Sequence, residues 1–146
     1  MTANHQRFEC LHEIVNAARD SLNADIWDYL RGGTDSETTV MRNRLALDSL
    51  AFRPRVLVDV AEVSCRTHFL GHDLRLPVTM APVGSLESFA EGGGVTAHAG
   101  AAEFGAGFCI SSVSSFSLED VAAAGNGLKI FQLYKRGDAD WADAIV

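Results

Sequence analysis

The sequence lacks the features that mark membrane-spanning, secreted and metal-binding proteins. No apolar run approaches the roughly 18 residues of a membrane-spanning helix, and the N-terminal MTANHQRFEC has no apolar stretch like that of a signal peptide. Cys10, Cys65 and Cys109 are far apart, and the histidines are scattered, so no ligand spacing suggests a metal site. We therefore expect no metal, no membrane span and three reduced thiols in a cytoplasmic protein.

Positive charge is also scarce. The chain has 12 Lys and Arg against 19 Asp and Glu, a net charge of -7. Nucleic acids and anionic membranes would repel such a surface, so neither is an expected partner. The 146 residues, 47% hydrophobic and 21% charged, suffice for one globular domain with a core.

The first third of the chain predicts three helices. Residues 8–18 carry apolar side chains at helical spacing, and Asn23 is placed to cap a second short helix. Gly32 and Gly33 are expected to end that helix, because glycine tolerates the positive φ of a helix end. A third helix follows, with Glu37 expected in its first turn.

The sequence pattern changes from helical to extended near residue 52. Residues 54–60 are β-branched and predict an extended segment, and residues 65–77 alternate around Gly71 as in a hairpin. We accordingly divide the sequence into an N-terminal helical segment with a hairpin, 1–77, and a second part, 78–146.

The second part alternates short apolar runs with helical patterns. The runs lie at 78–83, 107–112 and 129–134, and the helices at 95–105, 117–125 and from Asp138 to the end. Such alternation predicts an α/β fold with buried parallel strands, here the first three βα units of a partial (β/α)8 TIM barrel, which usually needs about 250 residues. Three parallel strands cannot close a barrel, and they leave an apolar sheet edge exposed. We therefore expect that the chain is a fragment of a longer protein, or that another chain supplies the remaining strands, and we favour the fragment.

Polar or small residues end each predicted strand, at the edge where such barrels hold their active sites. Gly84 exposes backbone after the first run, Ser111 and Ser112 end the second, and Gln132 and Tyr134 share one face of the third. These groups could bind a heteroaromatic ring and a carboxylate. The alternatives are that the serines only cap a helix and that Tyr134 is a core tyrosine.

At these residues the chain resembles the FMN-dependent α-hydroxy-acid dehydrogenase/oxidase family, which includes glycolate oxidase, lactate oxidase and mandelate dehydrogenase. The resemblance rests on an ordered set of motifs: DYLRGG, NRLALDSLAFRPRVLVDV, LGHDLRLPVTMAPVG, GAGFCISSVSSFSLEDVAAAG and KIFQLYKRGD. It covers the chain from about residue 8 to its end. No single motif is decisive, but chance would have to place all five in order.

The resemblance implies an FMN cofactor and oxidation of a 2-hydroxy acid to a 2-keto acid, with a hydride passed to flavin N5. Residues implied to contact the flavin are Pro82, Val83 and Gly84 along the ring, Ser111 on the isoalloxazine and Gln132 at its pyrimidine end.

Two tyrosines are implied to bind the substrate. Tyr29 matches the residue that hydrogen-bonds its carboxylate, and Tyr134 matches the catalytic tyrosine that steadies the developing charge. Full-length members of the family are commonly tetramers or octamers, which implies a homo-oligomer.

The chain also departs from the family pattern. Val113 stands where an aromatic residue is common, and Gly84 stands where many oxidases have alanine. The flavin-contacting lysine, the histidine base, the substrate arginines and the phosphate site would all come from later strands. His98 is no substitute for the base, since it lies in the middle of a predicted helix. The 146-residue piece is thus expected to be inactive alone.

Two other hypotheses stay open at this point. The chain could be a naturally short, non-catalytic binding or assembly subunit, which a true stop codon after residue 146 would favour. It could also be part of another FMN barrel enzyme, such as a type 2 isopentenyl diphosphate isomerase, but the pair of tyrosines suits a hydroxy acid better.

Overall fold

The computed structural model describes residues 8–145. They divide into a helical unit that ends at Asp59 and an α/β unit that begins at Val60. The sequence pattern instead divides the chain after residue 77, where the alternation of strands and helices begins, and that division stays a prediction. No helix in the described part of the chain is long and apolar enough to cross a membrane.

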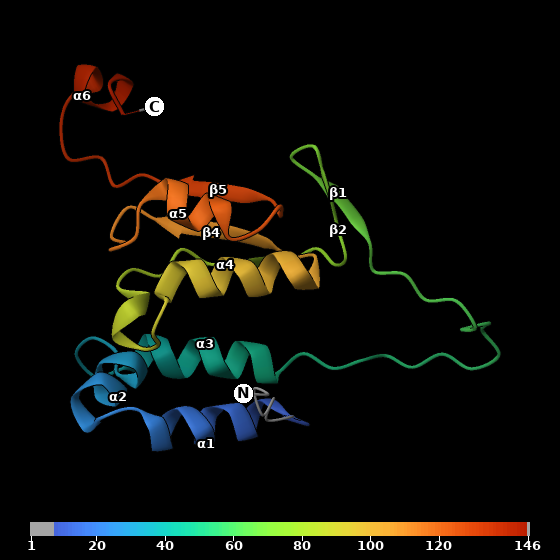
Figure 1. The fold of residues 1–146 in the computed structure, drawn as a ribbon. Helices are drawn as coiled ribbons and strands as arrows, with labels where there is room; N and C mark the ends of the chain where they lie inside the picture. The colour runs from blue at the N-terminus through green and yellow to red at the C-terminus, as the bar shows by residue number, and fades with distance from the viewer. Residues whose placement is uncertain (1–7, 146) are drawn as a thin grey trace, which may run out of the picture. The chain divides into compact units, whose positions relative to one another are not determined.

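The helical unit contains the three predicted helices. They are α1 Leu11–Ser21, α2 Ala24–Arg31 and α3 Thr38–Asp48 (Figure 1). The Asn23 side chain accepts a hydrogen bond from the Ile26 N–H at 2.9 Å, which confirms the predicted cap of α2. The first helix begins and ends three residues later than the spacing over 8–18 predicted.

In this unit one prediction was right for a different reason, since Gly32 ends α2 without a positive φ, and the predicted place of Glu37 was wrong. Gly32 follows α2 with φ -72°, so the helix does not end through a positive φ. Glycine is needed there for space, because a Cβ would lie 2.7 Å from the Asp28 carbonyl oxygen. Glu37 precedes α3 as its N-cap with φ 58° rather than standing in its first turn. Its carboxylate accepts the Gly33 N–H at 3.0 Å, which holds it outside the helix.

The hairpin forms as predicted, whereas residues 54–60 form no strand. Strand β1, Thr67–Phe69, pairs antiparallel with β2, His72–Leu74. The turn between them has positive φ at Leu70 (48°) and Gly71 (79°), the geometry that matches the twist of a two-residue hairpin.

The α/β unit has a parallel sheet in the order β3-β4-β5. Its strands are β3 Thr79–Met80, β4 Gly107–Ser111 and β5 Lys129–Gln132, and its helices are η1 Leu86–Ser88, α4 Gly93–Phe104, α5 Leu118–Ala123 and α6 Ala139–Asp143 (Figure 1). The predicted α/β class and the presence of three strands are confirmed, but β3 and β5 are shorter than the predicted runs 78–83 and 129–134, so Tyr134 follows its strand instead of sharing a face with Gln132. The last helix was expected to run to the end of the chain but stops at Asp143, and Val146 lies outside the described residues.

The core lies between β4 and the helices α4 and α5. Ala101, Phe108, Ile110 and Val121 form one buried cluster. Gly105 ends α4 with φ 84°, as predicted, and so turns the chain back into β4.

Strands β3 and β4 approach closely at Gly107. A Cβ there would lie 2.6 Å from Thr79 Cγ2 and 3.2 Å from Leu128 Cδ2. The glycine therefore sets how closely β3 can lie beside β4.

Candidate functional site

The carboxyl ends of β4 and β5 bring two predicted site residues together. Ser111 and Gln132 are directly paired in the parallel ladder. The Ser111 hydroxyl donates to Gln132 Oε1 at 3.4 Å, and Ser111 is 4% exposed. A hydroxyl and an amide thus stand side by side at the edge of the sheet where parallel α/β proteins bind ligands.

Hydrogen bonds join the loops that follow the three strands. The Val113 N–H donates to Ser111 Oγ at 3.1 Å, and the Val113 carbonyl accepts the Ser85 N–H at 2.9 Å. The Tyr134 N–H donates to Ser112 Oγ at 3.2 Å. The loops after β3, β4 and β5 are thereby fixed relative to one another.

These contacts decide against both alternatives raised by the sequence. The cap of α5 is Ser117, whose hydroxyl accepts the Asp120 N–H at 3.0 Å, so Ser111 and Ser112 are not helix caps. Tyr134 is 49% exposed and is therefore not a core tyrosine. It lies two residues beyond the end of β5.

Pro82, Val83 and Gly84 follow β3 and lie next to the loop that follows β4. Pro82 is half-buried, and Val83 is exposed. A Cβ on Gly84 would lie 3.2 Å from Val113 Cβ and 3.4 Å from its carbonyl oxygen. Gly84 thus lies directly against Val113, and a methyl group there would press on the neighbouring loop.

Tyr29 lies in α2, in the helical unit. The other six predicted site residues lie in the α/β unit. The structure therefore brings together the predicted flavin contacts and Tyr134 but leaves the pairing of the two tyrosines as a prediction.

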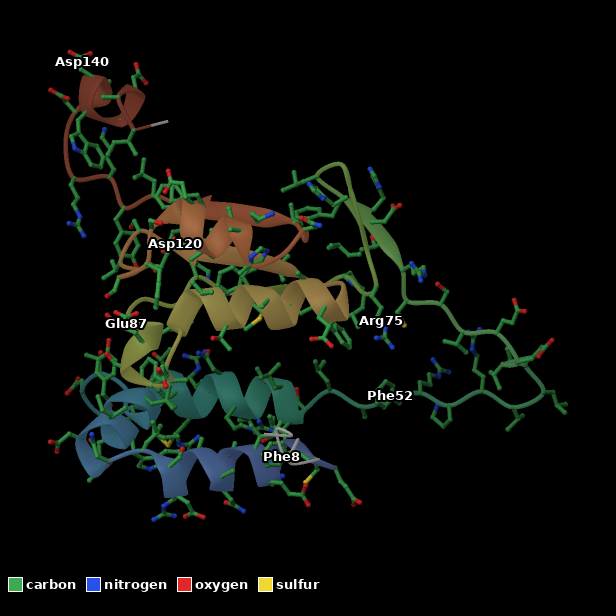
Figure 2. The ribbon with its side chains drawn as sticks, in the orientation of Figure 1. Phe8, Phe52, Arg75, Glu87, Asp120 and Asp140 are labelled. Atoms are coloured by element: carbon green, nitrogen blue, oxygen red, sulfur yellow. The ribbon has the colours of Figure 1, made fainter. Side chains whose placement is uncertain are left out.

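Glu87, in the short helix η1 after β3, is a feature that the sequence did not reveal. Its Oε1 accepts a hydrogen bond from the Ser115 hydroxyl, in the loop after β4, while its Oε2 is shielded and has no partner among the described residues. The hydrogen bond from Ser115 holds the pKa of Glu87 below its ordinary value. Neither residue stands in a periodic pattern, so only the fold reveals the contact. Figure 2 labels Glu87 at η1.

Replacing Ser115 by alanine is expected to raise the pKa of Glu87 toward its ordinary value. Because the native pKa is lowered, the stabilisation is present above the pKa of the unfolded state and disappears as pH falls through the native pKa. NMR titration of the Glu87 carboxyl carbon measures the shift. The control is Ser114→Ala, since the Ser114 hydroxyl accepts the Phe116 N–H and does not touch Glu87. An unchanged Glu87 titration in Ser115→Ala would contradict this assignment.

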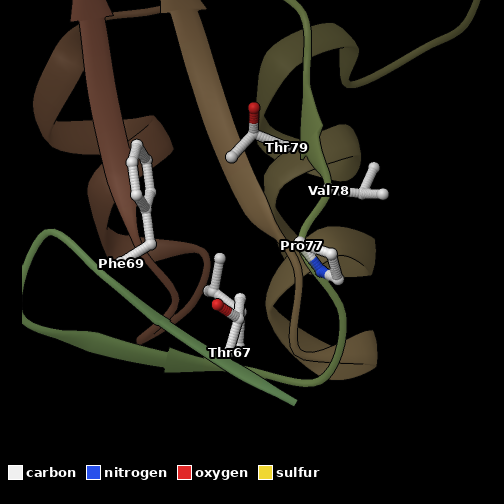
Figure 3. Close-up of a pocket in the computed structure, with 6 residues that line it drawn as sticks. Thr67, Phe69, Pro77, Val78 and Thr79 are labelled. Carbon is white, nitrogen blue, oxygen red and sulfur yellow. The ribbon is translucent and has the colours of Figure 1, made fainter. Parts of the chain in front are cut away.

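A hollow of about 280 Å³ lies at the other end of the strands. It is lined by residues of the hairpin and of the entry to β3: Thr67, Phe69, Leu74, Pro77, Val78 and Thr79 (Figure 3). The amino-terminal face of such sheets serves stability rather than catalysis, so this hollow is not the candidate site. No group of three potential metal ligands occurs within residues 8–145.

The described α/β unit has a parallel sheet with a hydroxyl and an amide at its carboxyl edge, the edge at which parallel α/β proteins bind ligands. The profile of the FMN-dependent dehydrogenase family matches residues 18–146. The chain belongs to this family, whose cofactor is FMN.

Named relatives agree with this membership. L-lactate dehydrogenase from Caulobacter sp. is 42% identical over 122 residues, covering 84% of this chain and 32% of the relative. L-lactate oxidase from Nostoc sp. is 36% identical over 141 residues, covering 93% and 38%. The structure of mandelate oxidase with benzoyl-formic acid matches with a TM-score of 0.88 at 34% identity, covering 95% of this chain and 42% of that one. The chain thus spans about a third of the length of the relatives that it matches.

Proposed function

We propose that the chain is the N-terminal part of an FMN-dependent enzyme that oxidises a 2-hydroxy acid to a 2-keto acid. In this proposal it supplies the first three βα units of a (β/α)8 barrel. The observation that carries the proposal is the pair Ser111 and Gln132 at the carboxyl edge of the sheet, next to the loop in which Gly84 packs against Val113.

The donors and acceptors at this edge fit a flavin ring. Gln132 uses its carbonyl oxygen toward Ser111, which leaves its two amide hydrogens for ring carbonyls or ring nitrogens. Val113 occupies the side of Gly84 on which a Cβ would stand, so we assign the opposite face of the Gly84 backbone to the flavin ring. We assign Pro82 and Val83 to the same wall of the site.

The two tyrosines are assigned to the substrate. FMN, when bound, supplies the electron acceptor for the oxidation, taking a hydride equivalent at N5. The Tyr134 phenol donates a hydrogen bond to the substrate oxygen, where it stabilises charge that grows toward the transition state. Tyr29 binds the substrate carboxylate. The hydrogen bond from the Tyr134 N–H to Ser112 fixes the backbone that carries the phenol.

The proton-abstracting base is assigned to a later part of the protein. His98 is fully buried, and its Nδ1 lies 2.6 Å from the Val121 carbonyl oxygen, so it cannot reach a substrate at the edge of the sheet. The fraction of each relative that the chain covers also supports a fragment.

Tyr134→Phe in the full-length protein tests the proposal. Turnover of a 2-hydroxy acid is expected to fall roughly a hundredfold, as when one hydrogen-bond donor to a developing charge is lost. FMN affinity is expected to change little, since the phenol is assigned to the substrate. The measurements are anaerobic bleaching of the flavin absorbance by a 2-hydroxy acid and titration of the apoprotein with FMN.

Phe131→Leu is the matched control, because Phe131 lies on β5, three residues before Tyr134, and is not assigned to the site. It is expected to leave turnover unchanged. A full-length protein that stays colourless with added FMN would overturn the flavin assignment. Equal losses of turnover and FMN affinity in Tyr134→Phe would overturn only the substrate role.

A further inference from the structure

Ser85 stands in a backbone conformation that residues other than glycine rarely adopt. Its φ is 52° and its ψ is 36°, in the left-handed region, and it directly follows Gly84, whose backbone is assigned to the flavin ring. A strained residue of this kind keeps its conformation only where the surrounding structure holds it. The turn that carries Gly84 therefore depends on contacts from outside the turn.

Two hydrogen bonds join this turn to the loop after β4. The Ser85 N–H donates to the Val113 carbonyl at 2.9 Å. Two residues further along each segment, the Ser115 hydroxyl donates to Glu87 Oε1. Because this second acceptor is a carboxylate, its hydrogen bond is stronger than one between neutral groups. The two bonds close one small ring between the two segments.

Both sides of this ring rest on the core of the α/β unit. Leu86 and Phe116, which neighbour Glu87 and Ser115 in the sequence, pack against the buried cluster. Gly93 lies against the same place, since a Cβ there would stand 2.9 Å from the Glu87 nitrogen and 3.2 Å from Phe116 Cε2. The bond between Glu87 and Ser115 thus connects two segments that are each packed in place, and it fixes one relative to the other.

We propose that Glu87 is a positioning residue for the flavin site. Through Ser115 it holds the strained turn at Ser85 and so fixes where the Gly84 backbone lies. Glu87 itself touches neither the flavin nor the substrate in this inference. The flavin role rests on the proposed function, whereas the holding of the turn rests only on the contacts described above.

Hydrogen exchange of the full-length apoprotein tests whether the bond holds the turn. Glu87→Ala and Ser115→Ala are each expected to speed exchange of the Ser85 N–H about fivefold or more, because the turn opens more often. The Phe108 N–H, which donates to the Leu128 carbonyl at 3.0 Å, is the internal control and is expected to keep its rate. Mass spectrometry of separate peptides resolves the two amides. Equal acceleration of both would mean that the substitutions only loosen the whole unit.

Titration of the apoprotein with FMN tests the positioning role. Glu87→Ala and Ser115→Ala are each expected to weaken FMN affinity about tenfold, the equivalent of one hydrogen bond to a charged group, and to shift the visible absorption band of the bound flavin. Glu87→Gln keeps an oxygen acceptor for the Ser115 hydroxyl and is expected to retain most of the affinity. Glu91→Ala, which removes an exposed carboxylate shortly after η1, is the matched control and is expected to change neither readout.

Two combined variants separate positioning from a general loss of structure. Glu87→Ala with Ser115→Ala is expected to bind FMN as weakly as either single variant, because both remove the same bond. Ser85→Gly is expected to restore most of the affinity of Glu87→Ala, because glycine adopts the left-handed conformation without strain.

The inference is overturned if Glu87→Ala binds FMN with unchanged affinity and spectrum, if the two single losses add up in the double variant, or if Ser85→Gly restores nothing. A full-length protein that binds no FMN would overturn the proposed function and the flavin role of Glu87 with it. The exchange rate of the Ser85 N–H would still decide whether Glu87 holds the turn, so the two failures are distinguishable.

Discussion

Replacing Phe108 by alanine is expected to destabilise the α/β unit by about 3–5 kcal/mol, the usual cost of truncating a buried aromatic residue. Phe108 is 2% exposed, lies on the central strand β4 and packs in the cluster with Ala101, Ile110 and Val121. A loss of this size is comparable to the whole stability of many domains. The free energy of unfolding, from urea denaturation followed by circular dichroism, measures the effect.

Phe131→Ala is the matched control on the neighbouring strand. Phe131 is 39% exposed and stands outside the buried cluster, so its truncation is expected to cost much less. Similar losses for the two substitutions would show that β4 is not the centre of the core.

Replacing His98 by alanine is expected to cost about 2–5 kcal/mol, because a fully buried side chain leaves a cavity. Its ring lies 5.7 Å from the Phe108 ring, and its Nδ1 lies 2.6 Å from the Val121 carbonyl oxygen. That oxygen also accepts the Ala124 N–H at 3.2 Å, so it keeps a partner when the imidazole is lost. Most of the cost therefore comes from packing rather than from the hydrogen bond.

His98→Phe separates the two contributions. It keeps a ring against Phe108, loses one hydrogen bond worth about 0.5–1.5 kcal/mol and removes the Nε2 atom, which has no partner among the described residues. It is expected to be clearly more stable than His98→Ala in the same urea experiment. Equal stabilities would mean that the hydrogen bond, and not the ring, holds α4 to α5.

The features that the sequence predicted correctly depend on short stretches of chain. Asn23 caps α2 through the Ile26 N–H three residues later, the hairpin turns at Gly71, and α4 ends at Gly105, each close to the place that the local sequence predicted. The apolar runs were found because a strand buried on both faces needs them. The same runs placed Ser111 and Gln132 near the carboxyl ends of their strands, where the structure pairs them.

The features that it missed depend on residues far apart in the chain. The contact of Gly84 with Val113, and the bond from the Ser85 N–H to the Val113 carbonyl, join loops from two different βα units. The local sequence of neither loop indicates which other loop it contacts. The position of Glu37 was also missed, although the contact is local. Its carboxylate accepts a hydrogen bond from the Gly33 N–H, four residues earlier, and this bond favours the conformation outside the helix. The role of Tyr29 stays a prediction.

The close approach at Gly107 has a consequence for how this sequence can evolve. A side chain at residue 107 would meet the Thr79 methyl group first and Leu128 next. Alanine at 107 is therefore expected to fit more easily in a background where residue 79 has already lost that methyl group, for example as serine, which leaves the Leu128 side chain to shift. The order of the two substitutions therefore matters. A change of Thr79 in β3 eases a later Gly107→Ala in β4, whereas Gly107→Ala alone meets the Thr79 methyl group.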